Sequence, residues 1–472
     1  MILYYFIIAV VLSLSVLFVK NKYYTIIATS LFLLIQSLFT IYVVKNIGLV
    51  DLAYFSFDAL GAIFLTLLTV ISIASFYHGL KYFRNRITHR YFYYHAAFIG
   101  LITSITGAYL SNDATLVWIL VEATTLTVSV LIYHEKTTYA LEATWKYIFL
   151  CSIGIAFAYV GILFISLSGK GLSDLSFASI ALSVTKVNPL YLKIAFVFVL
   201  IGYSTKMELF PMHTVGIDAN SVSPTPIAAL ISTGLVNLGF LSIFRFYIAL
   251  SSSSIFEWMN RIFILTGVLS LLVAAGYMLK AKHNKRMLAY STLENMGLVA
   301  IAIGLGGQGY YAAILLVILH TLTKSSLFFQ MGQVARTLHT FKLDECGGYM
   351  KRNPFGSGVL LLGMFVILAI PPSGIFVAEY MIVKSMITTH NWLLLTIVSL
   401  LLCFVIYAMS TRFMHILFSK SRIEESSPLV IKVSPWESLT QYIFLLTVIS
   451  ICFYRPPFLT DIISQCIAML PK

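Results

Sequence analysis

Charged residues are scarce in this chain: only 10% of its 472 residues are Asp, Glu, Lys or Arg, against about 25% in a typical soluble domain. Hydrophobic residues make up 59%, and the mean hydropathy is +0.92. Too few charged side chains remain to cover a soluble surface of this size. The composition therefore predicts an all-α polytopic membrane protein, because helices satisfy their own backbone hydrogen bonds in lipid.

Cysteine clusters and phosphate-binding loops are also lacking. The five cysteines form no CxxC pair and no cluster with histidine, so metal, iron–sulfur and disulfide sites have no support. No Walker loop, zinc signature or nucleophile elbow occurs, and the glycines of residues 304–309 follow no strand, as a dinucleotide fingerprint would require. We expect no catalytic residue, no metal site and no cofactor in this chain itself.

The formal net charge of +13 would suggest a nucleic-acid partner in a soluble protein. Here most basic residues fall in one set of alternate loops, around residues 20–22, 81–90, 136, 280–286, 336–352 and 412–432. Cytoplasmic loops of membrane proteins carry such an excess. The charge therefore predicts topology and no nucleic acid. We expect the first loop in the cytoplasm and both termini outside the inner membrane of a bacterium or archaeon.

Apolar windows long enough to span a bilayer predict about 14 transmembrane helices, at residues 3–19, 24–44, 58–79, 91–110, 114–133, 143–167, 191–213, 223–249, 259–279, 288–306, 309–335, 357–387, 391–418 and 438–454. The first window has no basic residues before it and no cleavage site after it, so we expect a membrane helix rather than a signal peptide. Residues 1–90 would form peripheral helices 1–3, and residues 419–472 helix 14 with its tail.

Prolines interrupt two of these windows, the seventh at Pro211 and the twelfth at Pro371 and Pro372. A break at membrane depth frees backbone groups that only a protein-lined cavity can satisfy. The two windows are five helices apart, and an odd spacing places them in opposite orientations. We therefore predict two inverted five-helix repeats, helices 4–8 (residues 91–250) and helices 9–13 (residues 258–418), each with one broken helix.

Lys206 lies in the first predicted break, where a lysine costs about 3 kcal/mol unless it has a partner or water. Glu122 is followed by two threonines that could satisfy a buried carboxyl without any role in transport. Lys146 could equally be an interfacial anchor beside Trp145. Arg245, near the end of its helix, is expected to extend its head group to the interface.

The second half holds a comparable set of ionisable residues. His320 and Lys324 are four residues apart, so they share one helix face, and the hydroxyls around them could be simple helix–helix contacts. Glu379 follows the second break, with Lys384 on a different face of the same helix. Glu294 is expected near the start of its helix, where a carboxylate is favourable for electrostatic reasons alone.

These motifs resemble those of one known family. The segments are Glu122-Ala-Thr-Thr-Leu, Glu142-Ala-Thr-Trp-Lys146-Tyr-Ile-Phe, Lys206-Met-Glu-Leu-Phe-Pro-Met-His213, Ala289-Tyr-Ser-Thr-Leu-Glu294-Asn-Met-Gly297, His320-Thr-Leu-Thr-Lys324-Ser and Pro371-Pro-Ser-Gly-Ile-Phe-Val-Ala-Glu379. Together they resemble the antiporter-like subunits of respiratory complex I, of membrane-bound hydrogenases and of multisubunit sodium/proton antiporters. The wording is most similar to the hydrogenase-4 component F branch.

The resemblance implies a proton relay along the middle of the membrane. Glu122 and Lys206 match the family's carboxylate–lysine pair, and Lys146 matches a lysine often found beside it. His320 or Lys324 matches the central relay, and Glu379 matches the outer terminal site. Secondary candidates are Glu294, Lys384, His213 and Asn237.

Two positions depart from the family's pattern. Asn237 stands where some relatives carry a lysine, and an asparagine cannot hold a proton at neutral pH. Met207-Glu208 stands where small residues are more usual. The link from Lys206 to the second half must therefore use His320, water or another group.

The resemblance implies a non-catalytic, ion-translocating membrane subunit of an oxidoreductase complex such as a hydrogenase or quinone reductase. Expected partners are other antiporter-like subunits, small membrane subunits, a redox arm, and the bilayer. The transported ion would be H⁺, or Na⁺ exchanged for it. Two alternatives stay open: a subunit of a redox-independent cation/proton antiporter, and a proton-coupled partner of a complex that takes up a small substrate such as inorganic carbon.

Overall fold

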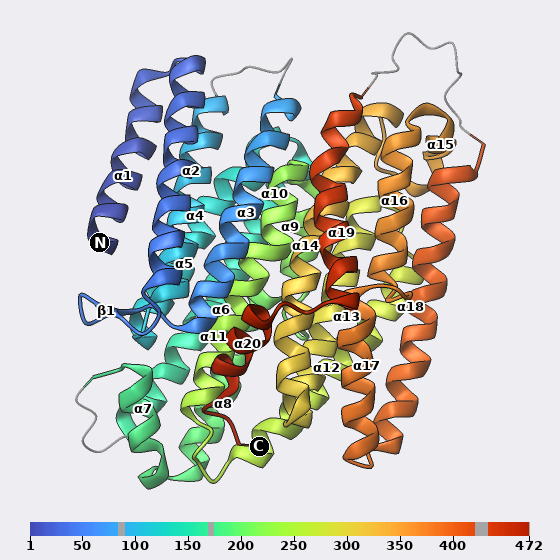
Figure 1. The fold of residues 1–472 in the computed structure, drawn as a ribbon. Coiled ribbons are helices and arrows are strands. Elements are labelled where there is room, and N and C mark those ends of the chain that lie inside the picture. Colours follow the sequence, from blue (N-terminus) through green and yellow to red (C-terminus); the bar gives the residue numbers. More distant parts are fainter. Residues whose placement is uncertain (84–89, 169–173, 421–432, 472) are drawn as a thin grey trace.

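The computed structural model describes residues 1–83, 90–168, 174–420 and 433–471, and almost all of them are helical (Figure 1). The first half contains α1 (Ile2–Val19), α2 (Lys22–Lys45), α3 (Ala59–Tyr82), α4 (Arg90–Leu110), α5 (Ala114–Ile132), η1 (Tyr133–Glu135), α6 (Thr138–Ser168), α7 (Phe177–Ser183), η2 (Val184–Lys186), α8 (Pro189–Met207), α9 (Thr214–Val222), α10 (Thr225–Leu230), η3 (Ile231–Leu235) and α11 (Val236–Ala249). The short strands β1 (Val50–Asp51) and β2 (Phe55–Ser56) form an antiparallel hairpin between α2 and α3.

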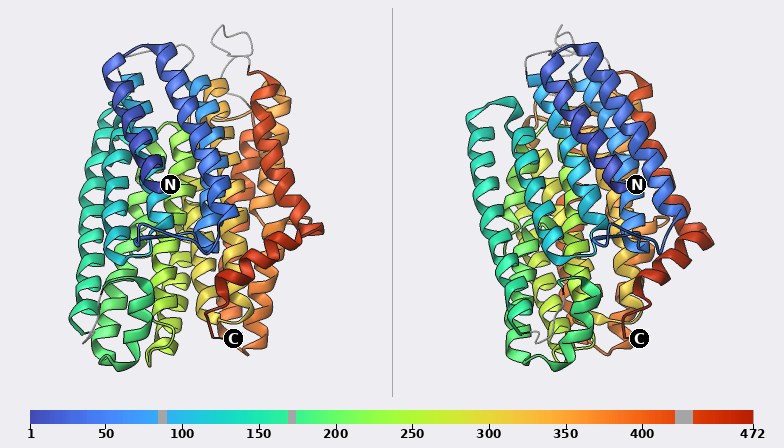
Figure 2. Two further views of the ribbon diagram at one scale, coloured as in Figure 1. Left: turned by 60° about the vertical axis from the view of Figure 1, so that its left-hand side comes forward. Right: turned by 90° about the vertical axis from the view of Figure 1, so that its left-hand side faces the viewer.

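The second half contains α12 (Phe256–Leu279), α13 (Asn284–Leu305), α14 (Gln308–Leu338), η4 (Leu343–Glu345), α15 (Tyr349–Arg352), α16 (Pro354–Ile367), α17 (Gly374–Thr388), α18 (Trp392–Phe418), η5 (Pro435–Ser438), α19 (Leu439–Phe453) and α20 (Pro457–Ile467). The long helices run side by side, with α1 at one edge of the bundle and α18 at the other (Figure 1). The short helix α20 lies obliquely across their direction (Figure 2).

Twelve helices in the described ranges are long and apolar enough to cross a membrane. The remaining two predicted windows hold α4 and the pair α16–α17. Each predicted window therefore coincides with one helix or with one broken helix. The short helices α7 and α20 were not predicted, because neither segment is long enough to register as a span.

Both proline-containing windows are broken. Helix α8 ends at Met207 and α9 begins at Thr214, while α16 ends at Ile367 and α17 begins at Gly374. Each break contains a cis proline, Pro211 in the first and Pro372 in the second. The breaks therefore lie where the proline pattern predicts them.

One end of the bundle, which we call the basic end, gathers the loops predicted to be rich in Lys and Arg. The turn before α13 meets the loop after α14, since the Leu343 amide donates to the Lys282 carbonyl at 2.9 Å. Burial and the cations of Lys285 and Arg286 lower the pKa of His283 to about 3, so this histidine adds no positive charge there. Of the predicted basic loops, residues 84–89 and 421–432 lie outside the described ranges.

At the opposite end, Arg245 does not extend to the interface as expected. Its side chain is buried, and its guanidinium forms an ion pair with Asp58 at 2.9 Å and donates to the Tyr109 and Ser111 carbonyls. Asp58 is also the N-cap of α3. The prediction failed because a carboxylate distant in sequence lies within reach, so the arginine instead ties α11 to α3 and α4.

Candidate functional site

The first half of the site is centred on Lys206, in the last turn of α8 before the break. Its side chain is 2% exposed. The Nζ atom donates to Thr125 Oγ1 on α5 at 2.9 Å and to the Tyr147 hydroxyl on α6 at 3.0 Å. It also lies 4.9 Å from the centroid of the Tyr147 ring, a cation–π distance. A buried ammonium thus has polar partners on two neighbouring helices, which offsets its desolvation.

Glu122 joins this cluster through a hydroxyl rather than by direct contact. Thr125 Oγ1, which accepts from Lys206, donates to Glu122 Oε2 at 3.2 Å. Ser152 on α6 donates to the other carboxylate oxygen at 3.0 Å. The predicted carboxylate–lysine pair is therefore brought together with Thr125 between its members. Such a hydroxyl both donates and accepts, so it can pass a proton between two groups.

Close backbone packing holds the break in place. A Cβ at Gly239 of α11 would lie 2.2 Å from the Met207 amide nitrogen and 2.7 Å from the Lys206 carbonyl carbon. No side chain fits in that space, so α11 lies directly against the last turn of α8. The position of the lysine is thus set by backbone contact with a neighbouring helix.

The second half of the site is centred on Lys324, whose side chain is fully buried in α14. Its Nζ atom donates to the Leu288 carbonyl at 2.6 Å and to Ser291 Oγ, both on α13. One turn further along α13 lies Glu294, which is 3% exposed and accepts from Asn295 Nδ2 at 2.6 Å. Lys324 and Glu294 interact electrostatically within the protein interior.

The expected position of Glu294 near a helix start is wrong. Helix α13 begins at Asn284, which places Glu294 in the middle of a helix that ends at Leu305. A favourable interaction with a helix N-terminus therefore cannot explain this carboxylate, because that effect fades within the first turn. Its electrostatic partners are Lys324 and the partly buried Glu379 of α17. Glu379 thus faces the same cluster from the second broken helix.

His320 and Asn237 lie between the two halves. His320 is fully buried in α14, and neither ring nitrogen has a hydrogen-bond partner within the described ranges. Asn237 at the start of α11 exchanges hydrogen bonds with Thr321, at 3.0 and 3.2 Å. The π-helical turn η3 immediately precedes Asn237, and such turns occur frequently at functional sites.

Three predicted candidates lie away from this buried axis. Lys146 is 51% exposed and forms an ion pair with Glu142 at 2.6 Å. Lys384 is exposed and lines a cavity near the start of α14 and the end of α19. His213 follows the first break, with its ring stacked on Phe210 at a centroid distance of 6.0 Å.

One residue that was not a candidate lies within the axis. Glu208 is 1% exposed, directly after Met207, and interacts electrostatically with Lys324. The signal in the sequence was the departure from the small residues usual at this position. That departure marked an oddity, but nothing in the sequence indicated where the carboxylate would point.

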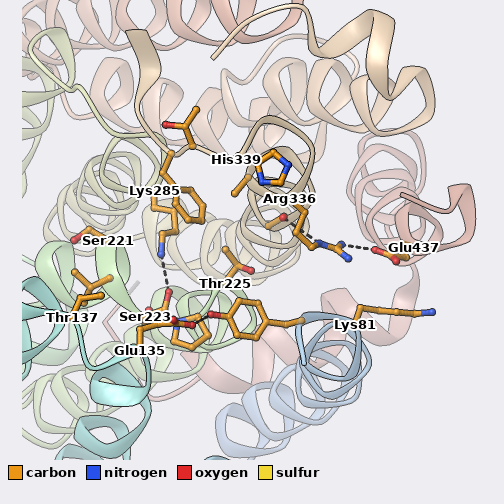
Figure 3. A pocket seen from close by; sticks show the side chains of 17 residues that line it. Lys81, Glu135, Thr137, Ser221, Ser223, Thr225, Lys285, Arg336, His339 and Glu437 are labelled. Carbon is orange, nitrogen blue, oxygen red and sulfur yellow. Dashed lines mark hydrogen bonds and ion pairs between the residues drawn. The ribbon is translucent and has the colours of Figure 1, made fainter. Parts of the chain in front are cut away.

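A cavity of about 560 Å³ opens at the basic end (Figure 3). It is lined by polar and charged side chains from six elements, including Lys81, Glu135, Thr137, Ser223, Thr225, Lys285, Arg336 and Glu437. Three interactions cross it: Lys285 Nζ donates to the Ser223 carbonyl at 2.7 Å, Tyr82 donates to Glu135, and Arg336 pairs with Glu437. In the described part of the chain, no three His, Cys, Asp or Glu residues gather as a metal site would require.

Comparison with known proteins agrees with this arrangement. A family model described as "NADH:quinone oxidoreductase/Mrp antiporter, TM" matches residues 111–405. The chain is 29% identical over 430 residues to the hydrogenase-4 component F homolog of Methylacidiphilum infernorum (isolate V4), covering 89% of each chain.

Solved structures show the same fold. A chain of the membrane-bound sulfane sulfur reductase, an archaeal respiratory membrane complex, matches with a TM-score of 0.87 at 22% identity, covering 99% of this chain and 97% of that one. A chain of respiratory complex I from Thermus thermophilus matches with a TM-score of 0.78 at 18% identity, covering 98% of each. The family model spans more than half of the sequence, and the chain belongs to the NADH:quinone oxidoreductase/Mrp antiporter family of membrane subunits.

Proposed function

We propose that this chain is a proton-translocating membrane subunit of a multisubunit oxidoreductase complex such as a hydrogenase or quinone reductase. The observation that carries the proposal is the buried lysine beside each end of the axis. Lys206 is linked to Glu122 through Thr125, and Lys324 interacts electrostatically with Glu294. Lysines in the membrane interior are costly and mark ion paths.

The relay would run from Glu122 and Lys206 through the centre of the bundle to Lys324, Glu294 and Glu379. In a medium of low dielectric constant, a change of charge at one member alters the proton affinity of the next. Electron transfer in a partner subunit would start such a series of changes. The two broken helices would belong to inverted repeats, residues 91–250 and 258–418, that flank the axis.

Co-purification and transport together test the proposal. The intact complex is isolated through a tag on this chain, its other subunits are identified, and the complex is placed in closed vesicles with a pH-sensitive dye inside. With the electron donor of the co-purifying redox subunit, we expect proton movement that a protonophore abolishes. Electron transfer at full rate without proton movement would refute the proposal. Na⁺-driven proton exchange without any redox subunit would favour the antiporter alternative.

We also propose that the basic end faces the cytoplasm of a bacterial or archaeal cell, with both termini outside. Two exposed positions flank α13, Lys280 at the basic end and Gln308 just beyond the other end. In a Cys403→Ser background, a membrane-impermeant maleimide should label Gln308→Cys in intact cells. It should label Lys280→Cys only after permeabilisation. The reverse pattern would invert the topology.

A further inference from the structure

Glu208 is an unusual group to find at the helix break. It is the C-cap residue of α8, with φ 59°, and its side chain is 1% exposed. Oε1 accepts a hydrogen bond from Asn220 Nδ2 at 2.9 Å. Oε2 is also buried, and no described residue donates to it or accepts from it. Buried carboxylates almost always have partners, so this oxygen calls for an explanation.

The space that Glu208 occupies is created by a glycine on α9. A Cβ at Gly216 would lie 2.2 Å from Glu208 Oε1 and 2.4 Å from its carboxyl carbon. Gly216, Asn220 and Ser223 follow one another at intervals of four and three residues, which places them on one face at the C-terminal part of α9. The carboxyl group of Glu208 therefore lies against this face of α9.

The same face leads to the cavity at the basic end. Ser223, one turn beyond Asn220, lines the cavity, and its carbonyl accepts from Lys285 (Figure 3). Ser223 Oγ and Asn220 Oδ1 resemble Glu208 Oε2 in being buried without a partner among the residues described. Three such atoms in a row along one helix face form a polar track, and water satisfies buried polar groups of this kind.

At its inner end, Glu208 lies between the two lysines of the axis. It interacts electrostatically with Lys324 of α14 and with Tyr147 of α6, which is itself a hydrogen-bond partner of Lys206. Asn237 offers no titratable group on this route. Glu208 is thus a group able to hold a proton, placed between the first half of the axis, the second half and the cavity.

We propose that Glu208 loads protons from the basic-end cavity along the α9 face and passes them to Lys324, an inference that rests on the proposed function. A proton from water in the cavity binds the Glu208 carboxylate and forms a neutral carboxylic acid. The acid then gives its proton to the neutral amine of Lys324, which becomes an ammonium, and the carboxylate is restored. Lys206 on the other side of Glu208 would favour one or the other state through its own charge.

Glu208→Gln in the intact complex tests this directly. Glutamine has the same size and can still accept from Asn220, but it cannot carry a proton. We expect redox-driven proton transport in closed vesicles to fall by about 10²-fold or more. Glu208→Asp keeps a carboxyl group and should retain transport within about tenfold of the parent. Glu257→Gln makes the same charge change at an exposed position on α12 and should leave transport unchanged.

Infrared difference spectra provide a readout that a purely structural role would not affect. Turnover of the parent complex should produce a carboxylic-acid C=O band that is missing in Glu208→Gln. Normal transport by Glu208→Gln, or equal loss in Glu208→Gln and Glu208→Asp, would overturn the role of Glu208 while leaving the proposed function intact. A parent complex that transfers electrons but moves no protons would instead refute the proposed function.

Discussion

Lys206→Ala is expected to reduce redox-driven proton transport by about 10²-fold or more, with little effect on the insertion of the chain. The substitution removes the buried cation that donates to Thr125 and Tyr147. Without it, Glu122 has no basic partner beyond the Thr125 hydroxyl, and the first half of the axis loses its proton acceptor. The measurement is dye quenching in vesicles that contain equal amounts of parent and variant complex.

Two further variants distinguish proton transfer from a fixed electrostatic role. Lys206→Arg keeps the charge, but a guanidinium stays protonated at all physiological pH values, so we expect it to be as defective as Lys206→Ala. Lys193→Ala removes a lysine from the same helix, near its other end and beside Trp258, and should transport normally. Full activity of Lys206→Arg would mean that this lysine never releases its proton.

The sequence predicted the features that depend on local chemistry. Long apolar windows became helices, because a membrane span has few alternatives. The prolines marked both breaks, because proline removes a backbone donor wherever it occurs. Lys206 and Lys324 were identified for a similar reason: a lysine within an apolar window is costly in any fold that buries it.

Features that depend on contacts between distant segments could not be predicted in the same way. Arg245 was expected at the interface, because nothing near it in sequence indicates that Asp58 lies 2.9 Å away. Lys146 and Lys206 are both lysines in apolar surroundings, yet the first lies on the outer face of α6 and the second between three helices. Which way Glu208 points depends on the glycine at position 216, eight residues away on another helix.

Glu379→Gln is expected to block the outer end of the axis and to reduce proton transport by about 10²-fold. Glu379 lies on α17, directly after the second break, and interacts electrostatically with Glu294. Because like charges repel strongly in the membrane interior, two carboxyl groups this close titrate as one unit. A glutamine at position 379 leaves Glu294 without the group to which its proton would pass. Asp461→Asn, an exposed carboxylate on α20, serves as the control and should transport normally.

A double-mutant cycle decides whether the two carboxylates act together. If Glu294 passes its proton to Glu379, then Glu294→Gln, Glu379→Gln and the double variant should lose transport to about the same extent, because each interrupts the same step. Losses that multiply in the double variant would mean that the two groups serve separate paths. In that case Lys324 would exchange protons with the outside through one carboxylate only, and the variant with the smaller loss would identify the group that lies off the route.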